Sequence, residues 1–365
     1  MLQMLSWRSL GLLVADLVLA VVLAAGCVPG PAPTAVATPP PVLNRTIEAS
    51  PAAPASPAAT IPTTPTLPAA ATPIAQTLTP SAQALPPRPA PPKLGAFDPA
   101  SVNGIRLSDY AVIPAISPGV VALYRASLAH GHNPHVFSKL GDCMTDNDYF
   151  LVPFAAKSSD LGPYGDLQAV IDQFEGVPAR SGNWQKDSFA TIGLAAAQGF
   201  NVASSLNPTW ANPQWCQNSE SPAACEYRVA KPTLAIIMFG TNDATYTEAS
   251  TYDYYLRRLV ALTLDSNVVP LLNTFPTRPE APEKSLLLNQ IVVKVAADYG
   301  VPLVNLSRAL EDLPNHGVDP QDTIHLSVPA DKRVDVFSAQ NLQAGFTVRN
   351  LVTLQALQAV LQAVK

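Results

Sequence analysis

The sequence predicts a three-layer α/β/α domain with a mostly parallel sheet over residues 96–365. Short apolar runs that suit buried strands alternate there with segments whose apolar residues recur at helical spacing. The composition also changes at this boundary, because 19 of the 38 prolines lie between Val28 and Gly95, in a stretch without aromatic residues. The 270 residues that follow are enough for one domain with a sizeable buried core.

The first element of this domain is a helix whose two ends are marked in the sequence. Ser117 can cap the helix and Pro118 suits its first turn. Residues 120–128 then carry apolar side chains at helical spacing, and Gly131 lies just past the end. We therefore expect a helix that ends before Gly131.

Strands and helices then alternate along the chain. Buried strands are expected at residues 136–140, 234–239, 268–275 and 301–306. Helices are expected at residues 252–264, at residues 284–299 before Gly300, and at residues 350–364. Residues 188–206 are expected to hold one more strand and helix. Because ligands bind at the carboxyl ends of parallel strands, any chemistry should lie where these strands end.

The first 27 residues have the outline of an export signal. Arg8 precedes an apolar run over residues 10–25, which Asp16 interrupts and which ends in small residues. This run is shorter than the roughly 20 residues that span a bilayer, so an uncleaved membrane anchor is the weaker interpretation. Residues 23–27, Leu-Ala-Ala-Gly-Cys, resemble a bacterial lipobox with Cys27 as the lipidated residue, although leucine stands one place further out than the pattern prefers. The alternative is an ordinary signal peptide with a chance cysteine.

Residues 27–95 are expected to be a disordered tether. Repeats such as residues 51–57, Pro-Ala-Ala-Pro-Ala-Ser-Pro, cannot bury enough apolar area to offset the entropy of ordering, and their prolines favour an extended chain. At about 3.1 Å per residue, the tether could reach on the order of 200 Å. The expected organisation is a signal peptide over residues 1–26, a tether over residues 27–95 and one globular domain over residues 96–365.

The charge of the chain excludes one class of partner. The formal net charge is −5, the isoelectric point is near 5.5, and no cluster of Lys or Arg is present. Nucleic-acid binders need a concentrated cationic surface to displace counterions from phosphates. We therefore expect no nucleic-acid partner.

Polar residues follow two of the expected strands directly. The first strand leads into Gly141-Asp142-Cys143, and the second leads into Gly240-Thr241-Asn242-Asp243. In each case a glycine allows a sharp turn, and the next residues stand exposed at the edge of the sheet.

Asp322 and His325 lie three residues apart further along the chain. On a turn, this spacing lets the carboxylate reach the imidazole and fix its tautomer. With Cys143 as a nucleophile and Asn242 as an amide donor, these residues supply the groups that acyl transfer needs.

The order of these motifs resembles that of the SGNH or GDSL hydrolases, and the resemblance covers most of residues 133–360. Residues 139–145 resemble the first family block, normally Gly-Asp-Ser, residues 240–243 match the Gly-x-Asn-Asp block, and residues 322–325 match the Asp-x-x-His block. The resemblance implies a flavodoxin-like, five-stranded sheet. It also implies an ester hydrolase that uses no cofactor and no metal ion.

Cys143 stands where the family places its nucleophilic serine. A thiolate is the stronger nucleophile, and a helix N-terminus and a histidine can lower the pKa of a thiol. Sulfur is also larger than oxygen and makes weaker hydrogen bonds, so a pocket shaped for serine could misplace it. The resemblance therefore implies the fold more firmly than the activity.

The resemblance implies a role for each residue of the site. His325 deprotonates Cys143, while Asp322 orients and stabilises the imidazolium. The backbone amides of Cys143 and Gly199 and the side-chain amide of Asn242 hold the developing oxyanion. Gly193 is the alternative to Gly199. The aspartates beside the working positions, Asp142 and Asp243, are expected to brace loops.

The remaining cysteines fit a compartment outside the cytoplasm. Cys216 and Cys225 could close a small loop as a disulfide, which would leave Cys143 outside any disulfide. A thiol in an oxidising compartment is open to oxidation, so Cys143 is either buried or used chemically, and a redox-sensing thiol is a third interpretation.

Two other groups of side chains could bind ligands. His130, His132 and His135 could hold zinc, but Gly131 and residues 133–134 indicate a helix end and a turn, so no metal site is expected. Trp210, Trp215 and Tyr227 could form a carbohydrate platform, although aromatics in a long loop more often pack it down.

Two functions from different classes fit these observations. The first is an ester hydrolase of the cell envelope, either membrane-tethered or secreted, that acts on a small-molecule or glycan acyl ester. The second is a non-catalytic relative that binds a glycan or an acyl compound. In either case we expect a monomer that meets the membrane through a lipid anchor at Cys27.

Overall fold

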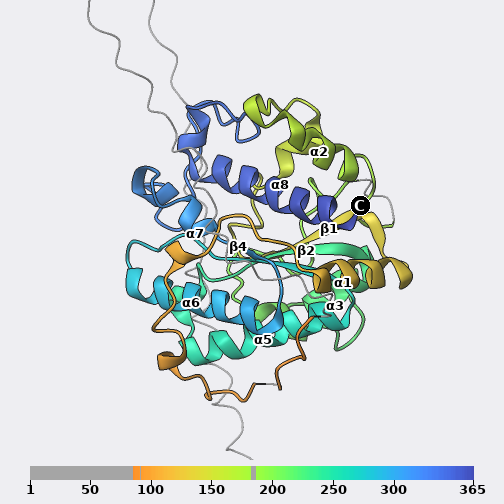
Figure 1. The fold of residues 1–365 in the computed structure, drawn as a ribbon, viewed down its shortest axis with the longest axis vertical. Coiled ribbons are helices and arrows are strands. Elements are labelled where there is room, and N and C mark those ends of the chain that lie inside the picture. The colour runs from red at the N-terminus through yellow and green to blue at the C-terminus, as the bar shows by residue number, and fades with distance from the viewer. Residues whose placement is uncertain (1–84, 91, 182–185) are drawn as a thin grey trace, which may run out of the picture. The chain divides into compact units, whose positions relative to one another are not determined.

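The sheet contains four parallel strands and lies between two layers of helices (Figure 1). The computed structural model describes residues 85–90, 92–181 and 186–365. The expected export signal, Cys27 and most of the expected tether therefore lie outside the described residues.

The four strands are hydrogen-bonded in the order in which they occur in the chain. They are β1 (Asn133–Gly141), β2 (Pro232–Met238), β3 (Val269–Asn273) and β4 (Leu303–Val304). Every neighbouring pair is parallel. All residues of β2 and β3 are buried, as is typical of central strands that are covered on both faces. The predicted parallel sheet is confirmed, and each strand overlaps its expected position.

The predicted number of five strands is wrong, since the described residues form a sheet of four. On the outer side of β1, a single bridge joins Gly141 to Ala196 where a fifth strand was expected. A turn closed by the bond from Ala196 N to Gly193 O precedes this bridge, and a turn closed by the bond from Phe200 N to Ala197 O follows it. The chain is therefore extended only at the bridge itself.

The helix expected within residues 188–206 does not form either. The only helical element described there is a 3-10 turn at Ser204–Leu206. Gly199 adopts a left-handed backbone conformation with φ of +78°, which an α-helix cannot contain. A succession of tight turns takes the place of the expected helix.

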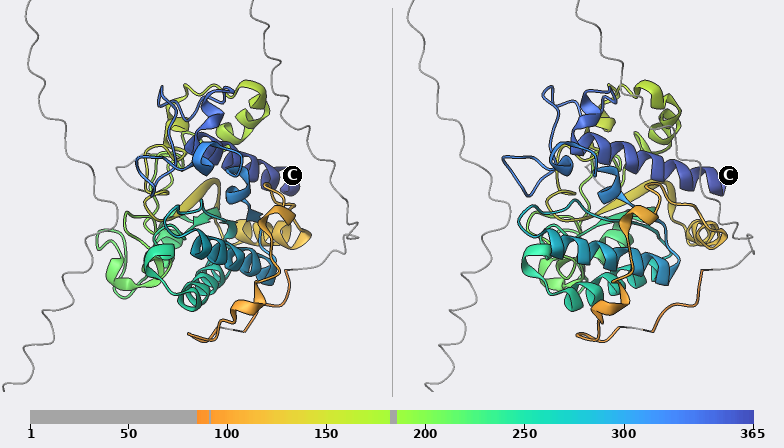
Figure 2. Two further views of the ribbon diagram at one scale, coloured as in Figure 1. Left: turned by 90° about the vertical axis from the view of Figure 1, so that its left-hand side faces the viewer. Right: turned by 60° about the vertical axis from the view of Figure 1, so that its left-hand side comes forward.

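Two groups of helices cover the two faces of the sheet (Figures 1 and 2). Helices α1 (Pro118–Ala129), α2 (Gln168–Phe174) and α8 (Gly345–Val364) lie on one face. Helices α3 (Pro222–Ala230), α5 (Ala249–Asp265) and α6 (Pro282–Tyr299) lie on the other. Two short helices, α4 (Asp243–Tyr246) and α7 (Leu306–Ala309), follow the ends of β2 and β4. This is the layered arrangement that the alternating pattern predicts.

The helices with clear sequence signals begin and end close to the expected residues. Ser117 Oγ accepts a hydrogen bond from Val120 N at 3.3 Å at the start of α1. Helix α6 ends at Gly300, whose φ of +64° is left-handed. Helix α8 begins at Gly345 rather than at residue 350. No helix among the described residues is long and apolar enough to cross a bilayer.

Residues 105–112 cover the edge of the sheet at β4. Asn305 N donates to Val112 O at 3.0 Å, and Asn305 Nδ2 donates to Leu107 O at 2.8 Å and to Tyr110 O at 3.1 Å. An uncovered edge would present unpaired backbone groups to other chains. The segment before α1 thus packs at the end of β4 and is held there by Asn305.

Candidate active site

Cys143 lies in the turn that follows β1, at the carboxyl edge of the sheet. Its side chain is 1% exposed and takes no part in a disulfide. Thr145 N donates to Asp142 O at 2.8 Å and Met144 N donates to Asp142 Oδ1 at 3.0 Å, so both bonds close the turn around Cys143. Glycine is required at position 141, because a Cβ there would overlap Thr145 and the backbone of β2.

Asp322 and His325 form a hydrogen-bonded pair on an exposed turn. His325 Nδ1 lies 2.6 Å from Asp322 Oδ2, and His325 N donates to Asp322 O at 3.1 Å. Burial opposes the ionisation of Asp322, but the hydrogen bond and charge of His325 outweigh it and lower the pKa of the carboxyl. A proton on Nδ1 leaves Nε2 able to accept one, which is the form that a general base needs.

The N-terminus of α8 holds the loop that carries His325. Ser327, two residues after His325, accepts from Gly345 N at 2.9 Å through Oγ and from Phe346 N at 3.0 Å through its carbonyl oxygen. These are two of the backbone donors that the start of a helix leaves without a partner in the helix. This long-range cap explains why α8 starts earlier than the sequence predicts.

The next turn of α8 holds the loop that carries Cys143. Arg349 donates to Met144 O and, at 3.0 Å, to Thr145 Oγ1. One turn of an α-helix rises only about 5.4 Å. Helix α8 therefore anchors the Cys143 turn and the His325 loop one turn apart, on the same stretch of helix.

Asn242 and Gly199 lie on segments that contact each other beside the site. Asn242 is 3% exposed, and its Nδ2 donates to Phe200 O at 2.8 Å. Gly199 occupies the third position of the turn that the bond from Phe200 N to Ala197 O closes, where a positive φ favours glycine. Gly199 itself is exposed.

Gly193 has a different environment. It is buried, and a Cβ at this position would overlap the carbonyl oxygen of Lys139 in β1. Lys139 lies two residues before the end of β1, so Gly193 is set back from the carboxyl edge. The geometry thus gives Gly193 a packing role and leaves Gly199 as the better candidate for the predicted oxyanion donor.

Two buried carboxylates brace the loops of the site. Asp142 holds Met144 N, and Asp243 accepts from Val202 N at 3.2 and 3.3 Å. Burial raises the pKa of Asp243 to about 7, with a further increase from the nearby charge of Asp142. Asp243 thus ties the start of α4 to the segment that follows Gly199.

Two buried cations beneath the site, Lys139 and Arg349, were not anticipated from the sequence. Each is 1% exposed. Lys139 Nζ donates to Phe189 O at 2.8 Å, and burial, together with repulsion by Arg349, lowers the pKa of Lys139 to about 7. The available signal was a single charge inside an apolar run, at residues 136–140 and again at residues 346–354.

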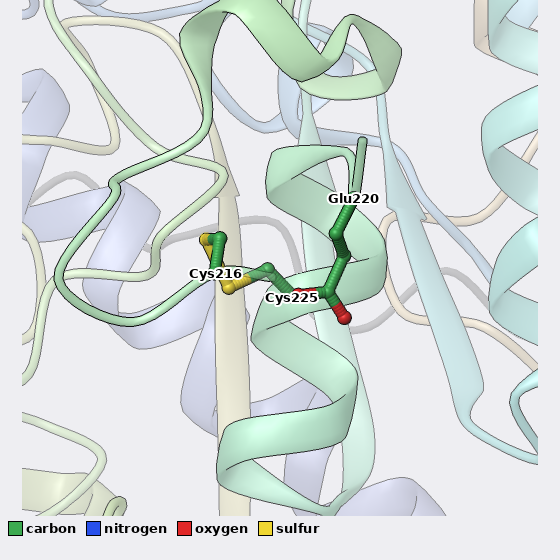
Figure 3. A group of neighbouring side chains, drawn as sticks. All are labelled: Cys216, Glu220 and Cys225. Carbon is green, nitrogen blue, oxygen red and sulfur yellow. A yellow bond between two sulfur atoms is a disulfide. The ribbon is translucent and has the colours of Figure 1, made fainter. Parts of the chain in front are cut away.

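Cys216 and Cys225 form a disulfide, which confirms the pairing expected from their spacing (Figure 3). Their sulfurs and a carboxylate oxygen of Glu220 lie within 4.8 Å of one another, a grouping that could suggest a metal site. Both sulfurs are used by the S–S bond, however, and Arg228 donates to both oxygens of Glu220 at 2.7 and 2.8 Å. These groups therefore fasten a loop to α3.

The three neighbouring histidines point to three different backbone carbonyls. His130 Nδ1 lies 2.8 Å from Ala126 O. His132 Nδ1 lies 2.7 Å from Pro232 O, and His135 Nδ1 lies 2.7 Å from Gln173 O. Each ring thus has a structural contact of its own, rather than a contact with the other two.

The aromatic residues of the long loop do not form one platform. Tyr227 is buried and bonds Thr263 at 2.8 Å, whereas Trp215 packs against Arg180. Trp210 is 45% exposed and packs edge-on against Phe200. Packing thus accounts for most of this group.

The comparison with protein-family models gives one match. Residues 173–332 match the model of the GDSL-like Lipase/Acylhydrolase family. This part of the chain is therefore similar to the GDSL-like lipase/acylhydrolase family. The matched range includes Asn242, Asp322 and His325, and it begins after Cys143.

Solved structures similar to this chain include three bacterial proteins of low sequence identity. The psychrotrophic esterase EstA from Pseudoalteromonas sp. is 13% identical, with 62% of this chain and 99% of that chain covered and a TM-score of 0.40. A GDSL-like lipase from Bacteroides thetaiotaomicron is 14% identical, with coverages of 66% and 98% and a TM-score of 0.37. The lipase/acylhydrolase from Enterococcus faecalis is 16% identical, with coverages of 60% and 96% and a TM-score of 0.36. The comparison with curated proteins gave no match.

Proposed function

We propose that this protein is an ester hydrolase in which Cys143, His325 and Asp322 form a variant catalytic triad. The observation that carries the proposal is the 2.6 Å contact between His325 Nδ1 and Asp322 Oδ2, on a loop that α8 anchors one turn away from the Cys143 turn. An oriented base beside a nucleophile at the end of a strand is the arrangement that acyl transfer requires. The similarity to the GDSL-like lipase/acylhydrolase family supports the same reaction class.

In the first half of the reaction, Cys143 displaces the alcohol of the ester. His325 Nε2 accepts the thiol proton, and the sulfur attacks the carbonyl carbon to give a tetrahedral intermediate. The amides of Cys143 and Gly199 and the Nδ2 group of Asn242 stabilise its oxyanion. The carbon–oxygen bond to the alcohol then breaks, the imidazolium returns its proton to the leaving alcohol, and a thioester remains.

Water completes the reaction by the same route. His325 removes a proton from water, and the resulting hydroxide attacks the thioester carbon. The carbon–sulfur bond breaks and the acid leaves, and the imidazolium returns its proton to the sulfur, so that the thiol is restored. Asp322 remains ionised throughout and stabilises the imidazolium in both halves.

For the setting of this reaction, we propose the outer side of a cell membrane and an acyl ester of a small molecule or a glycan. The export-signal pattern, the lipobox at Cys27 and the proline-rich stretch that follows support this setting. The Cys216–Cys225 disulfide is consistent with it, because disulfides persist outside the cytoplasm.

The second candidate is a non-catalytic protein that binds a glycan or acyl compound in the same site. The burial of Cys143 favours this candidate, since a sulfur that is 1% exposed offers little surface to a substrate. In this case the oxyanion donors would hold a ligand carbonyl without attack on it.

Hydrolysis of short acyl esters by the purified protein separates the two candidates. We expect measurable turnover by the native protein, loss to background in Cys143→Ala, and a burst of alcohol that reports the thioester. Equal background rates in the native and Cys143→Ala proteins would remove the cysteine mechanism. Activity gained only in Cys143→Ser would indicate a site that is arranged for catalysis but is inactive with sulfur as the nucleophile.

The role of Asp322 has a matched control in the same part of the chain. Asp322→Asn should lower kcat by on the order of 100-fold or more, because the amide favours the wrong imidazole tautomer. Asp331→Asn should have little effect on kcat, since Asp331 bonds Asn341 and lies outside the triad. Equal rates in the two variants would contradict the proposed role of Asp322.

A further inference from the structure

We propose that the buried guanidinium of Arg349 holds Cys143 in its thiolate form, so that the transfer of the thiol proton to His325 is complete before the substrate arrives. Arg349 is then a positioning residue that acts through Cys143. This inference rests on the proposed function for its purpose, but the charge state of the thiol can be measured without any substrate.

The position of the Arg349 guanidinium is fixed from three sides. It donates to Met144 O, one residue after Cys143, and to Thr145 Oγ1 at 3.0 Å. Its central carbon lies 3.5 Å from the centroid of the Phe150 ring. With 1% of the residue exposed, the cation is held against the Cys143 turn and is shielded from water.

The anionic partners of this cation are at the site itself. Burial lowers the pKa of Arg349 to about 9, while attraction to Asp142 and to Cys143 raises it, so the guanidinium stays protonated at neutral pH. The interaction is mutual: whatever favours the cation beside Cys143 favours the thiolate beside Arg349. In a site with little water, this attraction is weakly screened.

The other charged groups around Cys143 do not cancel the attraction between Arg349 and the thiolate. Asp142 opposes a thiolate, but Arg349 also interacts with Asp142 and offsets its charge. Asp243 has a pKa of about 7, so a large fraction of it is neutral at that pH. His325 and Lys139 add positive charge when they are protonated. Arg349 is therefore the cation that stays charged over the whole neutral range.

A buried cation also gives a reason for sulfur at this position. A serine hydroxyl does not ionise near neutral pH, so it would leave Asp142 as the only one of these two groups that can balance the charge of Arg349. A cysteine thiol, with an ordinary pKa of about 8.5, ionises readily beside Arg or Lys. The pair of Cys143 and Arg349 is thus chemically matched.

Thiolate absorbance at 240 nm, titrated with pH, tests the proposal on the whole chain. Subtraction of the Cys143→Ala titration isolates the signal of this thiol, and burial does not hinder the reading. In the native protein we expect a midpoint below about 8.5, the ordinary value for cysteine. In His325→Ala we expect the midpoint to remain below that value, because Arg349 is still present.

The variants at position 349 complete the test. Arg349→Gln should raise the midpoint by at least about one pH unit, a tenfold change in the ionisation constant. Arg349→Lys, which keeps the charge, should restore most of the shift. An unchanged midpoint in Arg349→Gln would overturn the proposal.

If Arg349→Gln fails to fold, the His325→Ala protein still tests whether Arg349 holds the thiolate. A midpoint at or above about 8.5 in His325→Ala would show that Arg349 does not hold the thiolate. A low midpoint in the native protein without ester hydrolysis would refute the proposed function and leave the role of Arg349 intact, so the two failures are distinguishable.

Discussion

Sulfur in place of oxygen changes the charge state of a nucleophile as well as its size. A hydroxyl stays neutral until a base acts, whereas a thiol can ionise in the resting protein. In the proposal above, the balance between Asp142 and Arg349 sets this ionisation at Cys143. The proposed activity would therefore depend on single side chains that the family motifs do not specify.

Asp243 makes the stability of the fold depend on pH. Its pKa is about 7 in the folded protein, mainly because of burial, and about 3.9 in an unfolded chain. The folded state therefore binds the proton more tightly, and the stability that this group contributes falls as the pH rises from about 4 to 7. Asp243→Asn should remove this loss, on the order of 1 kcal/mol per pH unit, so its advantage over the native protein should be larger at pH 8 than at pH 5. Urea unfolding at both pH values measures the difference.

Asp298 provides a control in which the pKa shift, and therefore the pH dependence of stability, has the opposite sign. Burial opposes its ionisation, but Lys294 and Arg257 outweigh burial and lower the pKa of the carboxyl. Asp298→Asn should therefore cost stability at neutral pH and cost less as the pH falls through the pKa of this group. The same pH trend in Asp243→Asn and Asp298→Asn would contradict the assignment of Asp243.

At the residue scale, sequence reasoning identified the Asp322–His325 contact but not the two buried cations. Three-residue spacing on a turn limits where a carboxylate and an imidazole can lie, so their contact follows from local geometry. Arg349 lies far along the chain from Cys143, and only the folding of α8 onto the β1 loop brings the two together. Local sequence patterns cannot predict such long-range contacts.

At the element scale, the helices with caps were the most predictable part of the fold. Ser117 begins α1 and Gly300 ends α6, because both signals act within a few residues. The start of α8 was misplaced, since Ser327 caps it from a distant loop. The absent fifth strand has a similar cause: apolar composition predicted extension, but turns on both sides of Ala196 limit it to one bridge.

The two candidate oxyanion glycines should respond differently to alanine. Gly193→Ala places a Cβ against the Lys139 carbonyl, so β1 or its neighbour must move and the protein should lose stability and activity together. Gly199→Ala meets open space and adds only the cost of a left-handed alanine, about 1–2 kcal/mol. Thermal unfolding should therefore show the larger loss in Gly193→Ala.

Activity should separate the same two variants further. Gly199→Ala should lower kcat through misalignment of the oxyanion amide, while most of the protein stays folded. Full activity in Gly199→Ala would remove this glycine from the oxyanion site.

At the scale of the whole molecule, the proposed lipid anchor makes a prediction about mass and location. The N-terminal peptide of the mature protein should begin at Cys27 and carry the mass of a diacylglyceryl group, and the protein should sediment with membranes. Cys27→Ala should remain unprocessed at this site. An unmodified N-terminal peptide in a buffer-soluble native protein would refute the lipid anchor and leave the catalytic proposal standing.

The described part of the segment before α1 is fastened at the β4 end of the sheet. Pro86 lies against Gly300 at the end of α6, Arg88 pairs with Asp265 at the end of α5, and residues 105–112 cover β4. Any pull transmitted along the chain from the N-terminal side would therefore load α5, α6 and β4 first. The Cys143 turn follows β1, the strand at the opposite end of the sheet order, so the anchor points of this segment do not include the Cys143 turn.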